Sequence, residues 1–175
     1  MRLTFRTADA DDVADVLGLV RAAYRGPESQ QGWTSEAGLL DDERIDAAGV
    51  LAKIANPAGM VLLAGSGEQP LIACCELVQR SPAVAYFGMF AVRPAAQSGG
   101  VGRAVLAEAE RRARTTFGAA TLEMTVIGQR TELIGWYVRR GYSVTGERRP
   151  FPYEALVNGT ALRDDLYFEV LAKDL

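Results

Sequence analysis

A glycine-rich segment between an apolar run and a helical pattern is the first part of this sequence that could do chemistry. It covers residues 92–104 and reads VRPAAQSGGVGRA. Glycine lets the backbone approach a ligand closely, and the first N–H groups of a helix have no partner within that helix. These groups and the helix dipole attract phosphate. The segment therefore predicts a site for a phosphate-bearing ligand.

The residues around the last glycine narrow down the class of ligand. A nucleoside triphosphate loop requires Lys and then Ser or Thr, whereas Gly102 is followed by Arg103 and Ala104. A dinucleotide fingerprint requires Gly or Ala where this chain has Val105. In such a fingerprint an acidic residue about twenty positions after the glycines binds the ribose. Glu123 lies near that position, but it falls within an apolar strand pattern. A dinucleotide-dependent oxidoreductase stays open as an alternative.

A second motif follows about thirty residues later, after a segment with an extended pattern. Residues 130–142 read RTELIGWYVRRGY. Four of the side chains fall on adjoining positions of a helix, namely Leu133, Trp136, Tyr137 and Arg140. Gly141 has the position of a left-handed residue that ends a helix. The pattern places Tyr137 on a short helix just after a strand.

The two motifs, in this order, resemble those of the GNAT superfamily of acetyl-CoA-dependent N-acyltransferases. The cofactor loop of that family reads Gln or Arg, two residues, Gly, one residue, and Gly or Ala, and residues 97–102 match it position for position. The later helix of the family carries Tyr shortly before a Gly-aromatic pair, as Tyr137 precedes Gly141 and Tyr142. The resemblance covers residues 84–149 by motif and implies acetyl-CoA as the cofactor.

The resemblance also implies which residues hold the cofactor. Backbone N–H groups at residues 90–92 would polarise the thioester carbonyl, because the family has a β-bulge there, and Gly88 would ease the distortion. Arg103 and Arg93 are either charge partners for phosphate or solvated surface residues. The candidate cofactor-binding residues are Phe90, Ala91, Val92, Gln97, Ser98, Gly99, Gly100, Val101, Gly102, Arg103 and Arg130.

Arg130 departs from the pattern of the family. Many members have Asn seven residues before the Tyr, where its amide helps to hold the pantetheine arm, and some relatives have Arg. Arg130 therefore either contacts the cofactor or forms an ion pair with Glu132 or Glu123.

Tyr137 is predicted to be the general acid that protonates the leaving thiolate, because a phenol stays protonated at neutral pH. The alternative is an aromatic side chain that fills the gap between helix and sheet. The base that deprotonates the amine is left open. Glu76, Glu123 and Tyr86 lie on strands that face the expected crevice, and a water chain could also serve. Either carboxylate could instead be a salt-bridged strand residue.

The sequence contains no histidine, which excludes Ser-His-Asp and Cys-His pairs and the usual zinc sites. Cys74 and Cys75 are adjacent, so on a strand they point to opposite faces and do not form an ordinary disulfide. Neither has an evident activator, and we expect both to be core residues rather than acyl carriers. We therefore expect direct attack by the amine and no metal.

Two segments are expected to hold the acceptor, residues 24–43 and 150–157. Trp33 and Tyr86 are the candidate substrate-binding residues. An aromatic and acidic lining that would suit a cationic amine is offered by Trp33, Glu36, Asp41, Asp42 and Glu43. The alternative interpretation of these acids is a solvated helix start.

The elements that must position these residues follow from periodicity and turn signals. Strands are predicted at residues 3–5, 60–64, 71–78, 84–92, 121–126, 142–147 and 166–171, and helices at 13–24, 45–55, 101–117 and 131–140. Pro27 is expected to close the first helix. The order predicts an α/β (α+β) fold with a mixed, mostly antiparallel sheet and helices on both faces. In the family, the central parallel strands splay apart and admit the pantetheine arm.

Length and composition limit the number of domains and the classes of partner. The 175 residues suit one domain, residues 1–175, and 22 acidic against 19 basic residues with a pI near 5.1 argue against nucleic acid as a partner. No apolar run is long enough for a membrane span, so we expect a cytoplasmic protein. A homodimer is left open. The sequence thus predicts an N-acetyltransferase that uses a small-molecule amine or a protein N-terminus as acceptor, with a non-catalytic acyl-CoA-binding module as the alternative.

Overall fold

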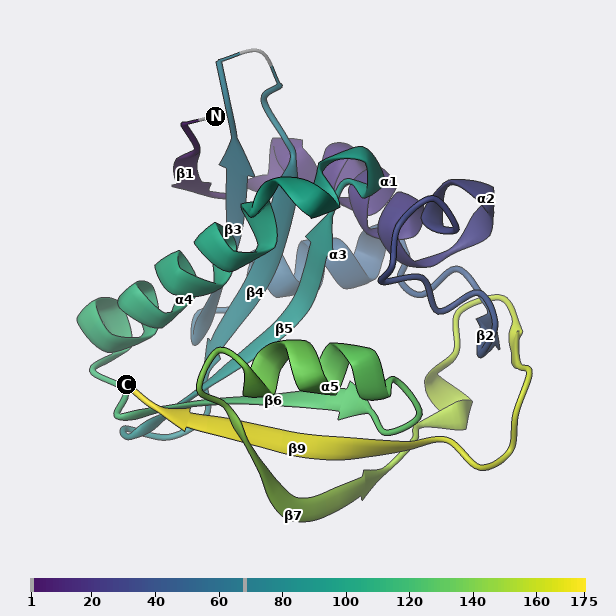
Figure 1. The fold of residues 1–175 in the computed structure, drawn as a ribbon. Coiled ribbons are helices and arrows are strands. Elements are labelled where there is room, and N and C mark those ends of the chain that lie inside the picture. The colour runs from purple at the N-terminus through teal and green to yellow at the C-terminus, as the bar shows by residue number, and fades with distance from the viewer. Residues whose placement is uncertain (1, 68) are drawn as a thin grey trace.

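Seven strands form a mixed sheet with helices on both faces (Figure 1). The computed structural model describes residues 2–67 and 69–175. Across the sheet the strands are β1 (Thr4–Thr7), β3 (Gly59–Gly65), β4 (Ala73–Gln79), β5 (Val84–Val92), β6 (Thr121–Ile127), β9 (Tyr167–Asp174) and β7 (Ser143–Pro150). Neighbouring strands are antiparallel except β5 and β6, which are parallel. The predicted mixed, mostly antiparallel sheet is confirmed.

The described helices are α1 (Val13–Tyr24), the short α2 (Gly26–Ser29), α3 (Ala47–Ile54), α4 (Val101–Phe117) and α5 (Thr131–Val138). All except α2 contribute to two hydrophobic cores, one on each face of the sheet, and a smaller third cluster contains Leu40, Ile127, Phe151 and Leu166. Leu62 of β3 lies in the core that contains α4 and α5, whereas Leu63 lies in the core that contains α1 and α3. Successive strand residues point to opposite faces, so one apolar strand supplies both cores.

The parallel strands β5 and β6 are paired over only part of their length. Their register ends at Tyr86, which lies opposite Glu123, although each strand continues for several residues. The Tyr86 hydroxyl and Thr125 Oγ1 lie 2.9 Å apart across the beginning of the gap. Beyond that point the two backbones separate. The predicted splayed pair is therefore present in the centre of the sheet.

A β-bulge lies in β5 beside this gap. The pairing with β4 passes from Cys74 opposite Ala91 to Glu76 opposite Gly88, which leaves one extra residue in β5. Met89 has a φ of 42° and is the left-handed residue of the bulge. The expectation that Gly88 takes up the distortion is wrong. Gly88 instead provides space, since a Cβ there would lie 2.8 Å from the Tyr86 ring and 3.2 Å from Glu76 Oε2.

The start of the chain has a capped turn before α1, and Pro27 does not have the role that was predicted for it. The Asp9 carboxylate accepts a hydrogen bond from the Asp11 N–H and caps a 3₁₀ turn, Ala10–Asp12, that leads into α1. Pro27 does not end α1, which stops at Tyr24. It lies in the first turn of α2, where a helix tolerates proline because the missing N–H is not needed.

The strands predicted at residues 142–147 and 166–171 are present as β7 and β9, which pair antiparallel, with β9 between β6 and β7. A further two-stranded sheet, which the sequence did not predict, joins β2 (Leu40–Asp41) to β8 (Thr160–Ala161). It connects the two segments expected to hold the acceptor. Within the described residues, no helix has both the length and the apolar character needed to cross a bilayer.

Candidate active site

Two cavities meet beside the separated ends of β5 and β6. The first, of about 280 Å³, lies between these strands and the segments around β2 and residues 151–156. The second, of about 220 Å³, lies between the glycine-rich loop and α5. Tyr24, Phe90 and Leu133 line both. The two cavities therefore lie next to each other, on either side of the same three side chains.

The glycine-rich loop presents open backbone to the second cavity. Gly100 is left-handed, with a φ of 76°, and directly precedes α4. A Cβ on Gly100 would meet nothing within 4 Å, whereas one on Gly102 would lie 3.4 Å from Phe90 and 3.5 Å from Trp136. The first N–H groups of α4 have no partner within the helix. The loop thus has the space and the donors that a phosphate requires.

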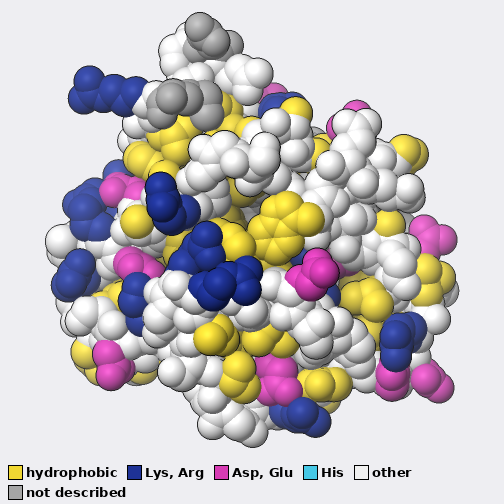
Figure 2. Space-filling model, viewed as in Figure 1, with side chains coloured by type: hydrophobic (Ala, Val, Ile, Leu, Met, Phe, Trp, Pro, Cys, Tyr) yellow, Lys and Arg dark blue, Asp and Glu magenta, His cyan; other side chains and the backbone are white. Residues whose placement is uncertain are grey.

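Basic side chains surround this loop. Arg103 and Arg140 line the second cavity, and Figure 2 shows basic side chains between α4 and α5 beside exposed hydrophobic ones. The Arg140 guanidinium lies 3.6 Å from the centre of the Trp136 ring, and its buried Nε has no hydrogen-bond partner among the described residues. Burial, with two neighbouring arginines, lowers the pKa of Arg140. Arg93 instead donates to the Leu71 carbonyl at 3.0 Å.

The Gln97 side chain forms hydrogen bonds to the segment before β2 and to the end of β5. Its Oε1 accepts a hydrogen bond from the Trp33 N–H at 3.0 Å. Its Nε2 donates to Thr34 Oγ1 at 2.8 Å and to the Val92 carbonyl at 3.1 Å. Gln97 therefore holds the segment before β2 against the end of β5.

Tyr137 is buried and lines the first cavity. Its ring packs edge-on against Trp136 and Tyr142, at centroid distances of 5.0 and 5.7 Å. Within the described residues, the Tyr137 hydroxyl has no hydrogen-bond partner. Burial raises the pKa of Tyr137 well above its ordinary value. The phenol consequently stays protonated at neutral pH and is free to donate.

Tyr24 is a second buried tyrosine at the site, which the sequence did not single out. Its hydroxyl donates to the carbonyl of Phe90 at the bulge, and burial raises its pKa. Tyr24 is the last residue of α1 and continues the helical spacing of its apolar side chains. From the sequence it could not be distinguished from a core residue. Only the contact with the bulge reveals its place beside both cavities.

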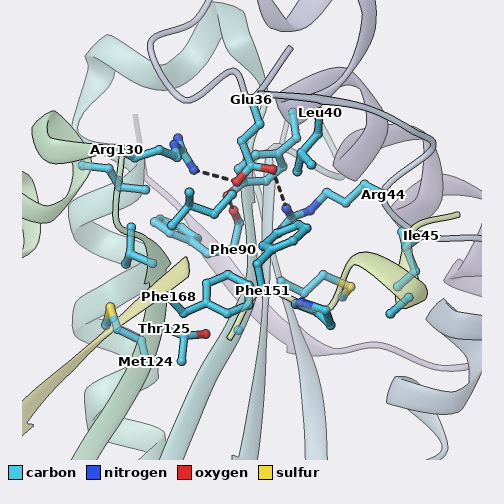
Figure 3. A pocket seen from close by; sticks show the side chains of 18 of the residues that line it. Glu36, Leu40, Arg44, Ile45, Phe90, Met124, Thr125, Arg130, Phe151 and Phe168 are labelled. Carbon is cyan, nitrogen blue, oxygen red and sulfur yellow. Dashed lines mark hydrogen bonds and ion pairs between the residues drawn. The ribbon is translucent and has the colours of Figure 1, made fainter. Parts of the chain in front are cut away.

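A buried ion-pair network forms one wall of the first cavity (Figure 3). Glu36 Oε2 accepts from Arg25 Nη1 at 2.5 Å and from Arg44 Nη1 at 2.9 Å, and its Oε1 accepts from Arg130 Nη1 at 2.9 Å. Asp42 accepts from Arg25 Nε at 2.6 Å. Burial acts to raise the pKa of Glu36, but the three guanidinium groups outweigh it and the pKa is lowered.

The network corrects two expectations. Arg130 forms its ion pair with Glu36, and neither Glu132 nor Glu123 is its partner. Its Nη2 donates to the Thr34 carbonyl at 2.6 Å, so it fastens the same segment that Gln97 holds. Glu36 and Asp42 are not the solvated start of a helix, since their side chains are only 5% and 2% exposed.

The family of the chain follows from a match that spans the site. Residues 18–142 match the model of the acetyltransferase (GNAT) family, which includes the glycine-rich loop and α5. The chain belongs to the GNAT family. It is accordingly an acyltransferase. No curated protein matches its sequence.

Solved structures share this GNAT fold at low sequence identity. An N-acetyltransferase from Staphylococcus aureus Mu50 has a TM-score of 0.73 and 12% identity, covering 99% of this chain and 98% of that one. A structure provisionally assigned as a phosphinothricin N-acetyltransferase has a TM-score of 0.71 and 17% identity, with 99% coverage of both. A chimera of the spermidine N-acetyltransferase SpeG from Vibrio cholerae and hSSAT has a TM-score of 0.69 and 15% identity, covering 99% and 96%.

The candidate catalytic residues of this GNAT protein lie in different places. Glu76 is buried and accepts from Lys53 Nζ at 2.7 Å, and Lys53 lines the first cavity. Tyr86 lines the same cavity. Glu123 is held by Arg149 Nη2 at 2.9 Å and lines neither cavity.

The remaining candidates divide between the second cavity and the cores. Trp33 is 43% exposed and lies 6.0 Å from Trp136 in the second cavity, which makes it a neighbour of the loop. Ser98 and Val92 line this cavity too. Three residues line neither cavity, namely Ala91, Gly99 and Val101, of which Ala91 and Val101 are core residues.

The two cysteines of the GNAT protein are free, fully buried and in opposite cores, as expected. Burial raises the pKa of Cys74 to about 12 and that of Cys75 well above its ordinary value. A thiol with such a pKa is not ionised at neutral pH and is a poor nucleophile. Within the described part of the chain, no group of His, Cys, Asp or Glu could hold a metal ion.

Glu36→Gln is expected to lower the free energy of unfolding by about 3 kcal/mol at pH 7, because it leaves buried guanidinium groups without their countercharge. Urea unfolding measures this change. The pKa of Glu36 is lower in the folded protein, so the stabilisation is present above its ordinary value of 4.5 and is lost as pH falls below it. The difference from the wild type should therefore shrink in acid.

Asp41→Asn is the matched control, since Asp41 is exposed and lies in the same segment. It should change the stability by less than about 0.5 kcal/mol. Equal stabilities of the two variants would contradict a stabilising role of the network.

Proposed function

We propose that this protein transfers the acetyl group of acetyl-CoA to a primary amine by direct attack, and that residues 1–175 form one catalytic domain for this reaction. The observation that carries the proposal is the junction of the two cavities. The glycine-rich loop lines one, Tyr137 lines the other, and Phe90 next to the bulge lines both. The free, buried cysteines suit a reducing compartment, so we propose that the reaction is cytoplasmic.

The residues of the second cavity fit acetyl-CoA. N–H groups at the start of α4 would hold phosphate oxygens, and Gly100 leaves room for them. Arg103 and Arg140, which line this cavity, would add charge-assisted hydrogen bonds to phosphate. When bound, acetyl-CoA supplies the acetyl group as an activated thioester.

The protein would promote the transfer through backbone and Tyr137. N–H groups at the bulge would polarise the carbonyl, since the break in pairing with β4 leaves the backbone at Met89 and Phe90 outside the regular ladder. Tyr137 would give its proton to the leaving sulfur as the amine nitrogen bonds to the acetyl carbon. The proton lost by the nitrogen would restore the Tyr137 hydroxyl through water, so the step yields an amide and a thiol.

Glu76 is the carboxylate that the geometry supports as the proton acceptor for the incoming ammonium. Glu76 is not itself a lining residue but lies directly behind Gly88, which lines the first cavity: its Oε2 would be 3.2 Å from a Cβ on Gly88. Glu123 is held by Arg149 outside the lining. The unpartnered Tyr137 hydroxyl favours an enzyme over a non-catalytic acyl-CoA-binding module, because a module needs no donor at that position.

Gly102→Asp is expected to lower the affinity for acetyl-CoA at least about 100-fold, because it places a negative charge in the narrow space between Phe90 and Trp136. Calorimetric titration with acetyl-CoA, with NADH as the comparison ligand, measures the affinity. Gly18→Asp is the control, since Gly18 lies on the exposed side of α1 with free space around it. Folded wild-type protein that does not bind acetyl-CoA would refute the proposed function.

Tyr137→Phe is expected to lower kcat by about 100-fold or more without changing the affinity for acetyl-CoA, because it removes the proton donor and keeps the ring. Release of free thiol with a panel of amines gives the rate. Tyr142→Phe is the matched control, because the Tyr142 hydroxyl bonds to Glu110 at 3.0 Å and the residue lines neither cavity. If Tyr137→Phe turns over at the wild-type rate, Tyr137 has no part in the chemistry.

A further inference from the structure

The first cavity carries an excess of positive charge. Its lining contains the cations Arg25, Arg44, Lys53 and Arg130 and the carboxylates Glu36 and Asp42. Glu76 neutralises Lys53 from outside the lining. Four cations thus face three carboxylates among the described residues. The lining therefore has a net positive charge. The acidic sequence of residues 36–43 had instead predicted a negative site that would suit a cationic amine.

The surplus charge belongs to Arg44. Arg25 uses Nε on Asp42 and Nη1 on Glu36, and Arg130 uses both of its terminal nitrogens, on Glu36 and on a backbone carbonyl. Arg44 donates a single hydrogen bond, from Nη1 to an oxygen that Arg25 also uses. Within the described residues, its Nε and Nη2 donate to nothing.

Three features hold Arg44 in place over the cavity. Its guanidinium lies 3.9 Å from the centre of the Tyr24 ring, and its side chain is only 26% exposed. Its backbone is left-handed, with a φ of 62°, which an arginine adopts only where surrounding contacts require it. Figure 3 shows Arg44 directed toward Glu36 at the cavity. The free donors are therefore fixed in position.

We propose that the acceptor carries a carboxylate beside its amine, and that Arg44 binds this carboxylate in the first cavity. This inference rests on the proposed acetyl transfer. A guanidinium with two free donors matches the two oxygens of a carboxylate. The bound carboxylate supplies the negative charge that the network lacks. A polyamine would add further positive charge to a wall that already has a surplus.

The geometry also limits the size and character of this acceptor. Arg44 stacks on Tyr24, whose hydroxyl bonds to Phe90 at the bulge, so the carboxylate site is one aromatic ring away from the reacting carbonyl. The amine must therefore lie within a few bonds of the carboxylate. The lining also contains apolar side chains, among them Leu40, Met124, Phe151 and Phe168. These features describe an amino acid with an apolar side chain.

The test compares amino acids with the amines that result from loss of their carboxylate. The pairs are L-leucine with isopentylamine and L-phenylalanine with phenethylamine, and spermidine serves as the polyamine. We expect the wild type to have a kcat/KM at least about 100-fold higher for the amino acids. In Arg44→Gln this value should fall about 10- to 100-fold for the amino acids. For the matched amines the fall should be at least tenfold smaller.

Two further variants separate binding from folding. Arg44→Lys keeps the positive charge but loses the paired donors of the guanidinium. Its kcat/KM for the amino acids should therefore lie between the values of wild type and Arg44→Gln. Arg21→Gln should behave as wild type, because Arg21 pairs with Glu43 and lines neither cavity. Acetylation of spermidine or the simple amines in preference to the amino acids would overturn the proposal, as would an equal fall for both members of a pair.

A binding measurement separates this inference from the proposed function. N-acetyl-L-leucine and N-acetylisopentylamine are titrated calorimetrically into wild type and Arg44→Gln, each with coenzyme A present. Binding of the first compound alone, lost in Arg44→Gln, supports the carboxylate site even if no amine is acetylated, in which case acetyl transfer is the proposal that fails. Equal binding of both compounds overturns the carboxylate site and leaves acetyl transfer unaffected.

Discussion

The separation of β5 from β6 is the constraint on which the site depends. The two strands share only the register from Val84 to Tyr86, and each completes its sheet pairing on its other side, with β4 and β9. Backbone groups that face the gap have no strand partner there, and such polar groups need a partner from solvent or a ligand. The bulge at Met89 extends this break to the β4 side of β5. The sheet thereby gains an opening at its centre, beside the first cavity.

Charged side chains from distant parts of the sequence form one wall of the cavity beside the gap. Arg130 and Glu36 are 94 positions apart, yet their contact joins the start of α5 to the segment before β2. Desolvation of such groups is costly, and several mutual pairs are needed to offset it. The network, with Gln97, fastens an otherwise irregular segment over the site. The same arrangement leaves Arg44 with unused donors, so the structural network and the proposed carboxylate site share residues.

The two buried tyrosines show how position decides a role. Both have a raised pKa from burial, so neither ionises at neutral pH. The Tyr24 hydroxyl already donates to the Phe90 carbonyl, whereas the Tyr137 hydroxyl has no partner among the described residues. Tyr24 therefore supports the bulge and the Arg44 side chain, and Tyr137 remains available to a ligand.

The sequence by itself determined the features that arise from local backbone preferences and side-chain periodicity. The glycines before α4, the apolar period of the strands and helices, and the Tyr137 helix each depend on neighbours within a few residues. Tertiary structure decided the partner of Arg130, the burial of Glu36 and Asp42, the left-handed Met89 in place of Gly88, and the place of Tyr24. An ion pair or a shared cavity depends on which distant segments the fold brings together, and this cannot be predicted from the local sequence. The reaction class was thus predictable from two local motifs, whereas the charge that lines the first cavity emerged only from packing.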